Sequence, residues 1–161
     1  MDRAELAAAQ WAKEMPGLDL LPMEVVGRLS EATQLISRSR LEPLFASFDL
    51  QRGEFDVLAT LRRAGAPYAL TPTLLYGATM ISSGGMTNRL DRLEKAALIE
   101  RQPNPEDRRG VLVALTEKGL ELVNRVVPAH VENERQALSV LTEEEQIQLN
   151  GLLAKLLHHW G

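Results

Sequence analysis

The feature of this sequence that most restricts its fold is a hairpin pattern placed between two helical segments. Residues 98–102 and 111–115 suit short strands, and the eight residues between them are rich in turn formers. That turn carries Asp107, Arg108 and Arg109. The pattern therefore predicts a β-hairpin with a charged tip.

The segment before the hairpin predicts two helices joined by a tight turn. Thr71 fits the N-cap and Pro72 the first position of one helix. Ser82 can cap the next helix, over 83–96, whose inner face is apolar: Met86, Leu90, Leu93 and Ala97. Its outer face is polar: Thr87, Asn88, Asp91, Arg92 and Lys95. Two short helices in this arrangement form a helix-turn-helix, and the hairpin behind them makes it a winged helix-turn-helix.

The rest of the chain is predicted to be helical apart from one short strand at 68–70. Apolar residues recur at helical spacing over 3–14, 23–48 and 52–63. Pro43 should kink the second of these helices. Thr116 can cap a long helix, bent near Pro128, and a capping box at 142–145 opens the last helix. We therefore expect a mainly α fold with a small β-wing.

Length and composition narrow the class of protein. A chain of 161 residues with 45% apolar residues suits one domain with one core. It contains no Cys, which excludes disulfides, thiolate metal sites and cysteine-based redox sensing. No segment is apolar over the length of a membrane span, and the start lacks the pattern of a signal peptide. We therefore expect a cytoplasmic protein without a membrane partner.

The net charge of −4 argues at first against a nucleic-acid partner. The distribution of charge is more informative than the total. Residues 38–116 carry 11 Lys and Arg against 9 Asp and Glu, whereas the two flanks together carry 7 against 13. The winged-helix segment is thus the candidate DNA surface, although an asymmetry this mild does not establish DNA binding.

The polar face of the second helix suits DNA recognition. A helix fits the major groove, and the free N–H groups at its N-terminus favour phosphate. We expect DNA contacts from the following side chains: Ser82, Ser83, Thr87, Asn88 and Arg92. An ordinary amphipathic helix with a solvated face explains this helix equally well.

The charged hairpin favours the DNA interpretation. Arg108 and Arg109 at an exposed tip can enter a narrow minor groove. Asp107 would orient the loop by pairing with a neighbouring arginine. A charged turn alone is common, but a charged hairpin directly after a helix-turn-helix is much more specific.

These residues together resemble the MarR family of winged-helix transcriptional regulators. The family pattern of Asp, any residue, Arg, five residues, Leu-Thr, two residues and Gly occurs as Asp107, Arg109, Leu115, Thr116 and Gly119. The stretch 86–94, MTNRLDRLE, is similar to the family's recognition helix. One departure is Ala97, where many members have Gly. Because Ala disfavours the left-handed backbone, we expect that turn to differ.

The resemblance implies a single MarR-like domain over 1–161, with a DNA-binding core at 50–116. Residues 1–48 and 117–161 would form an N-terminal extension and dimerisation helices. The implied partners are double-stranded DNA with a pseudo-palindromic operator and a second copy of the chain. Apolar helical side chains beyond the needs of one small core agree with dimerisation: Leu120, Val123, Val126, Val127, Ile147, Leu149, Leu152, Leu153, Leu156 and Leu157. In the alternative, these helices complete a monomeric core.

Four residues resemble those of the urate-responsive, PecS-like branch of the family: Trp11, Asp56, Arg89 and Arg101. The resemblance implies an effector, not a cofactor: a small aromatic anion such as urate that stacks on Trp11 and pairs with Arg89. The anion would repel Asp56, move the recognition helix and relieve repression. In the alternative, Trp11 anchors the extra helix, Asp56 pairs structurally with Arg89, Arg101 contacts the DNA backbone, and no purine binds.

Two other classes of function are alternatives at this point. An enzyme is not supported, because the sequence has no phosphate-binding glycine loop and no nucleophile elbow. The three histidines, His130, His158 and His159, lie in the expected dimerisation helices. They do not favour a shared metal site, because adjacent His158 and His159 point in different helical directions. A winged helix used only for protein contacts is the second alternative, because fold does not fix function.

Overall fold

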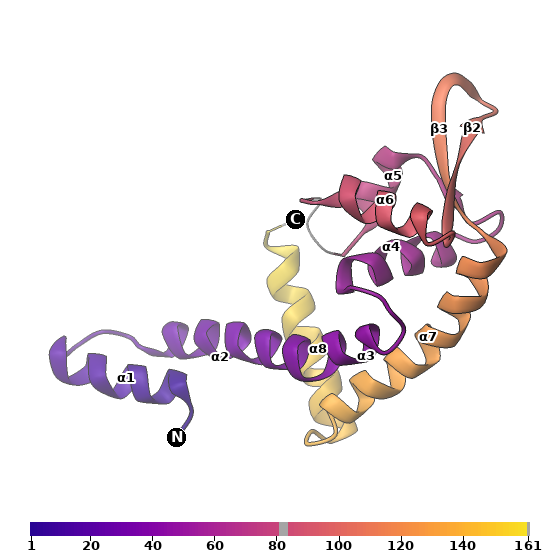
Figure 1. Ribbon diagram of the computed structural model, residues 1–161. Coiled ribbons are helices and arrows are strands. Elements are labelled where there is room, and N and C mark those ends of the chain that lie inside the picture. The colour runs from indigo at the N-terminus through magenta and orange to yellow at the C-terminus, as the bar shows by residue number, and fades with distance from the viewer. Residues whose placement is uncertain (81–83, 161) are drawn as a thin grey trace.

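The computed structural model describes residues 1–80 and 84–160 and shows helices arranged around one small sheet (Figure 1). The helices are α1 (Arg3–Glu14), α2 (Leu21–Ile36), α3 (Glu42–Ala46), α4 (Arg52–Arg63), α5 (Pro72–Ala78), α6 (Met86–Lys95), α7 (Glu117–Ala137) and α8 (Glu143–His158). A π-helical segment, η1 (Ser37–Leu41), joins α2 to α3. The strands are β1 (Ala69–Leu70), β2 (Ile99–Asn104) and β3 (Asp107–Leu115). The mainly α fold with a small β-wing is therefore confirmed.

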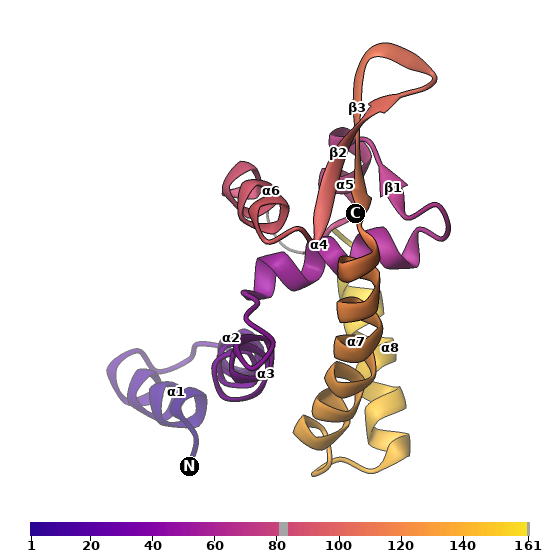
Figure 2. The same ribbon diagram turned by 45° about the vertical axis from the view of Figure 1, so that its right-hand side comes forward.

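The sheet has the order β1-β3-β2, with both pairings antiparallel. Strands β2 and β3 extend beyond the rest of the molecule as a wing (Figures 1 and 2). Their pairing continues to Asn104 opposite Asp107, so only residues 105 and 106 form the turn. The predicted loop of eight residues is wrong, because the Asn104 Oδ1 atom accepts the Glu106 N–H at 3.0 Å and closes a tight turn.

The long N-terminal helix is interrupted earlier than predicted. The backbone widens into the π-helical segment η1 before Pro43, which lies in the first turn of α3. Proline has no N–H to donate, and its ring crowds the carbonyl one turn earlier, so a widened turn relieves the clash. The expected irregularity at Pro43 is present, as a π-helical segment.

Helix α6 begins at Met86 rather than at Ser83. Gly85 has a φ of +77°, a left-handed conformation that cannot belong to a right-handed helix. The predicted cap, Ser82, and the predicted first residue, Ser83, lie outside the described residues. Gly84 and Gly85 therefore form a turn that leads into the helix.

Helix α6 ends in a Schellman motif. The N–H of Ala97 donates to the Glu94 carbonyl at 2.9 Å, and the N–H of Leu98 donates to the Leu93 carbonyl at 3.0 Å. Ala97 adopts the left-handed φ of +58° and is exposed, so its predicted place on the inner face is wrong. The turn keeps the geometry expected of glycine, because two backbone hydrogen bonds and the burial of Leu98 hold it.

One hydrophobic core lies between α4, α6, the sheet and α7. Its largest fully buried apolar side chains come from all of these elements and from α3 and α5: Phe45, Val57, Leu58, Leu61, Leu75, Leu93, Ile99, Val113, Val123 and Val126. Val123 and Val126 were counted among the apolar side chains beyond the needs of this core, and that interpretation is wrong for both, because the first half of α7 completes the core and buries them fully. Helix α7 continues beyond it through the internal Pro128 and curves away (Figure 1).

The terminal helices have no comparable interior. No residue of α2 or α8, both described throughout, is buried, and α1 buries only Ala4 and Ala8. Helix α8 instead exposes large apolar side chains: Ile147, Leu149, Leu152, Leu156 and Leu157. These helices therefore do not complete the core of this chain.

Candidate DNA interface and effector pocket

Helix α6 rests on the first turn of α4. The Arg92 Nε atom donates to Glu54 Oε1 at 2.8 Å, and the Glu54 side chain is only 3% exposed. The other oxygen of Glu54 accepts the N–H of Gln51 at 2.8 Å as part of a capping box. One turn earlier on α6, the Arg89 side chain lies over Gly53, where any Cβ atom would overlap it. The sequence placed Arg92 on the DNA surface and gave no sign of this contact between distant residues.

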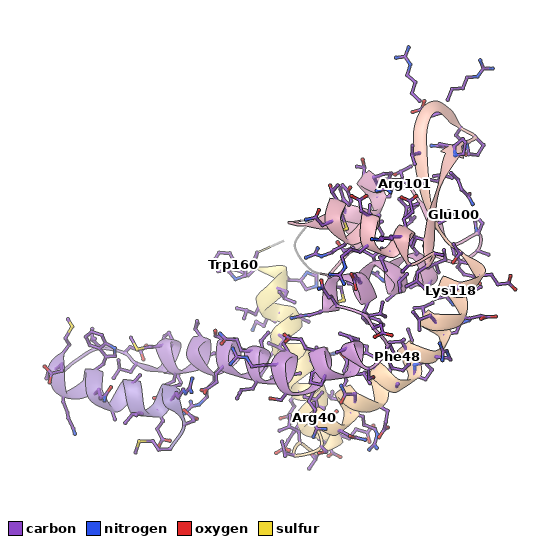
Figure 3. All side chains as sticks on the ribbon, in the orientation of Figure 1. Arg40, Phe48, Glu100, Arg101, Lys118 and Trp160 are labelled. Atoms are coloured by element: carbon purple, nitrogen blue, oxygen red, sulfur yellow. The ribbon has the colours of Figure 1, made fainter. Side chains whose placement is uncertain are left out.

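The C-terminal end of α6 is fixed to the start of α7. The Thr116 hydroxyl donates to the Ala97 carbonyl at 2.7 Å, and the Lys118 ammonium donates to the Ala96 carbonyl at 2.9 Å. Figure 3 shows Lys118 at this junction, near the base of the wing. A Cβ atom at Gly119 would overlap the Leu98 carbonyl oxygen. The Thr116 and Gly119 positions of the family pattern therefore serve to dock α7 against the end of α6.

The outer surface of α6 and the wing tip carry the residues predicted to contact DNA. Thr87 and Asn88 are exposed in the first turn of α6, whose N-cap, Gly85, provides no side-chain hydrogen bond. Arg108 and Arg109 are exposed at the wing tip, from which long side chains extend in Figure 3. This surface thus presents uncapped helical N–H groups and two guanidinium groups.

Asp107 orients the wing through the backbone. Its Oδ1 atom accepts the N–H of Arg109 at 3.0 Å, forming an Asx turn. The expected pairing with an arginine side chain is replaced by this backbone hydrogen bond, which leaves the two arginine side chains exposed. Gly110 supports the turn, because a Cβ atom there would lie 3.2 Å from Asp107 Oδ2 and from the Asn104 side chain.

Arg101 ties the wing to α6. Its guanidinium pairs with Asp91 at 2.8 Å and with Glu94, on the side of α6 that faces β2 (Figure 3). The hydrogen bond to Asp91 and the charge of Glu94 raise the pKa of Arg101 above its ordinary value. The two carboxylates therefore neutralise a group predicted to bind an anion.

The four predicted effector residues do not meet within this chain. Asp56, 9% exposed, accepts the backbone N–H of Met80 at 2.8 Å and lies one turn after Gly53, the residue that Arg89 covers. The structure thus brings Asp56 and Arg89 to the same part of α4. Trp11 is 43% exposed on α1, which packs on α2 at the far end from the winged helix (Figures 1 and 2). Arg101 lies with its carboxylates at the wing.

A small pocket lies where α4 faces α7. Its volume is about 180 Å³, and its lining residues come from several elements: Leu41, Phe45, Arg52, Phe55, Asp56, Met80, His130 and Glu134. The His130 ring contacts the stacked rings of Phe45 and Phe55, and its Nε2 atom lies 3.1 Å from Glu134. The buried Nδ1 atom of His130 has no hydrogen-bond partner in the described structure.

Sequence reasoning missed His130 as a site residue. It placed His130 in a dimerisation helix, and no local pattern shows that this helix passes Asp56. Within the described residues, no cluster of His, Asp or Glu is arranged to hold a metal ion. No helix in that part of the chain has the length and apolar character needed to cross a membrane.

A helix-turn-helix docked on a buried helix, followed by a protruding hairpin with exposed arginines, defines a winged-helix DNA-binding protein. The model of the MarR family matches residues 48–110. The chain is 49% identical to the HTH-type transcriptional regulator PecS of Dickeya dadantii over 150 residues, which is 93% of this chain and 90% of that protein. The chain therefore belongs to the MarR family and is of PecS-like type.

Solved structures agree with this assignment. A mutant of Escherichia coli MarR complexed with operator DNA is 30% identical, with a TM-score of 0.72 over 91% of this chain and 97% of that one. Bordetella bronchiseptica BpsR, whose DNA binding is regulated by 6-hydroxynicotinic acid, is 28% identical, with a TM-score of 0.68 over 83% and 98% of the two chains. This protein is a DNA-binding transcriptional regulator rather than an enzyme.

Proposed function

We propose that this protein acts in the cytoplasm as a homodimeric repressor that binds a pseudo-palindromic operator. The observation that carries the DNA part of the proposal is the joint exposure of the α6 N-terminus and the wing tip. Thr87 and Asn88 would reach base edges in the major groove, with Ser82 and Ser83 beside them in the chain. Arg108 and Arg109 would enter the flanking minor groove. A protein-contact role for this surface is the alternative.

The exposed apolar surface of the terminal helices supports the homodimer. Monomeric proteins rarely leave a long apolar helical face in water. Leu149 and Leu153 of α8 line a groove of about 530 Å³ with Val25, Leu29 and Ile36 of α2. A twofold dimer through such helices would place two α6 helices about 34 Å apart, one DNA turn from each other.

The pocket between α4 and α7 supports a small anionic aromatic effector such as urate. At about 180 Å³ it is smaller than the roughly 300 Å³ at which pockets for drug-sized ligands begin, so it suits a ligand of one or two rings. His130 and the rings of Phe45 and Phe55 offer aromatic contact, and Arg52 offers a positive charge. BpsR, with its aromatic acid, is a structural relative that responds to this kind of ligand.

Asp56 would transmit the presence of the anion. An anion near Asp56 repels its carboxylate and weakens the hydrogen bond to the Met80 N–H. Met80 precedes α6 in the chain, and Arg89 of α6 lies against the same part of α4. The ligand relieves DNA binding if it favours a conformation in which α6 has moved. Trp11 and Arg101 would take part through the partner subunit or through a rearranged wing.

A mobility-shift titration with and without millimolar urate tests this function. DNA from upstream of the gene should bind in a saturable, salt-sensitive manner, and urate should release it. Asp56→Asn should keep DNA binding and blunt the response to urate, and Arg89→Ala should keep the fold and blunt the same response. Release of the Asp56→Asn variant at the wild-type urate concentration would exclude this switch, and binding that ignores urate would exclude the ligand. Failure to bind any DNA specifically would favour the protein-contact alternative.

A further inference from the structure

Arg92 lies on the recognition helix but points its Nε atom at protein rather than at solvent. The Arg92 side chain is 57% exposed, while the side chain of Glu54, whose carboxylate it contacts at 2.8 Å, is 3% exposed. A carboxylate so deeply buried is costly unless it is paired. Arg92 therefore balances the buried negative charge of Glu54.

Glu54 is itself held rigidly. Its second oxygen accepts the Gln51 N–H at 2.8 Å, which closes the capping box of α4. Both oxygens thus have fixed partners, one on its own helix and one on α6. The ion pair fixes the lateral position of the middle of α6 against the first turn of α4.

The neighbouring turn of α6 reinforces this contact. Arg89 covers Gly53, and the absence of a side chain at Gly53 allows its close approach. Consecutive residues of α4 thus meet consecutive turns of α6, one by shape and one by charge. The pair of contacts determines how far the outer face of α6 projects towards DNA.

The structure therefore assigns Arg92 a role other than the predicted DNA contact: we infer that Arg92 positions the recognition helix through Glu54 and does not neutralise a phosphate. Its charge is already balanced by Glu54, so DNA binding through it would release no counterion. Its loss should harm the specific complex, in which α6 must fit the groove, more than the non-specific complex.

The test compares Arg92→Gln, Glu54→Gln and the double variant, with Arg109→Ala as a matched control at the wing. The probes are a labelled duplex with the tightest sequence that the protein selects from a random pool, and a scrambled duplex of the same composition. Fluorescence anisotropy at several salt concentrations gives the dissociation constants and the salt slope. Glu54→Gln keeps an oxygen that can accept the Gln51 N–H, and thermal melting checks that each variant is folded.

Each single variant should weaken binding of the selected duplex about tenfold, with binding of the scrambled duplex changed by less than about twofold. The salt slope should stay at the wild-type value, and the double variant should resemble either single one. Arg109→Ala, in contrast, should weaken both duplexes and lower the slope by about 0.9.

A phosphate contact gives the opposite pattern. Arg92→Gln would then weaken both duplexes and lower the slope, whereas Glu54→Gln would leave binding unchanged or tighten it by freeing Arg92. That result would overturn the inference. If Glu54→Gln does not fold, the salt slope of Arg92→Gln decides alone, since Arg92 lies at the surface.

Discussion

The winged-helix core and the terminal helices of this chain differ in how much of their apolar surface is buried within one chain. The core places whole side chains out of water, with Val57, Leu58 and Leu61 of α4 at 0% exposure. Helix α8 contains six large apolar residues against four in α4, but it leaves Leu152 and Leu157 at 67% and 70% exposure. The winged-helix core buries its apolar side chains within one chain. The terminal helices have the apolar composition of a core, but this chain provides no second surface that covers them. The difference indicates where the fold depends on a partner.

Gly119→Ala should destabilise the winged-helix core, and we expect this to be the largest effect of the substitutions considered. A methyl group there overlaps the Leu98 carbonyl, so the start of α7 must move away from the end of α6. We expect a loss of about 3 kcal/mol in the free energy of unfolding, measured by urea denaturation.

Gly77→Ala is the matched control, because nothing lies within 4 Å of a Cβ atom at that helical position. It should be neutral or stabilise by about 0.5 kcal/mol. Equal stability of the two variants would show that α7 is not docked through Gly119.

Leu156→Asp should disrupt dimerisation through the terminal helices without unfolding the winged-helix core. The side chain is 45% exposed in the single chain, and a charge there would be buried against a second copy. We expect the dimer dissociation constant to rise at least about 100-fold, measured by sedimentation at several protein concentrations.

His158→Asp adds the same charge to the opposite side of α8, because two residues turn a helix by about 200°. It should leave the dimer intact. Dimerisation that is equally strong in both variants would mean that the apolar side of α8 is not the interface.

Ala97→Gly should have the smallest effect, a stabilisation of the winged-helix core that leaves the terminal helices unchanged. Glycine adopts the left-handed φ of +58° without the strain that alanine bears. The expected gain is about 0.5–1 kcal/mol after the extra entropy of glycine in the unfolded chain is subtracted.

The neighbouring residue provides the control for this prediction. Ala96 has an ordinary helical φ of −77°, so Ala96→Gly should destabilise by about 0.5–1 kcal/mol. Thermal denaturation of the two variants should therefore give melting temperatures on either side of the wild type. A loss of stability for Ala97→Gly would show that the turn carries no strain.

Local chemistry made much of this fold predictable. Thr71, Thr116 and Thr142 all cap the helices that the sequence assigned to them, because a cap depends on residues only three positions apart. The two strand-like stretches around a run of turn formers predicted the wing for the same reason. The Gly85 turn was missed because glycine is compatible with both a helix start and a left-handed turn, and only the fold selects one.

The site was less predictable, because its contacts join distant parts of the chain. Nothing near Arg92 indicates that Glu54 will face it, and nothing near His130 places it beside Phe45 and Asp56. The same is true of Arg101, because one of its carboxylate partners, Asp91, was assigned to the outer face of α6 and the other, Glu94, was not singled out. A one-dimensional pattern identifies which residues are polar, while the packing of helices determines which of them are already paired.

The residues of the wing also protect this protein against aggregation through its exposed edge strand. In the order β1-β3-β2, β2 is an edge strand that protrudes from the molecule, and such edges can recruit strands of other chains into aggregates. Here that edge carries Glu100 and Arg101, which Figure 3 labels on β2, and then Pro103, which has no N–H to offer a new strand. The charged residues and the proline of β2 thus keep this long, exposed hairpin from pairing with strands of other chains.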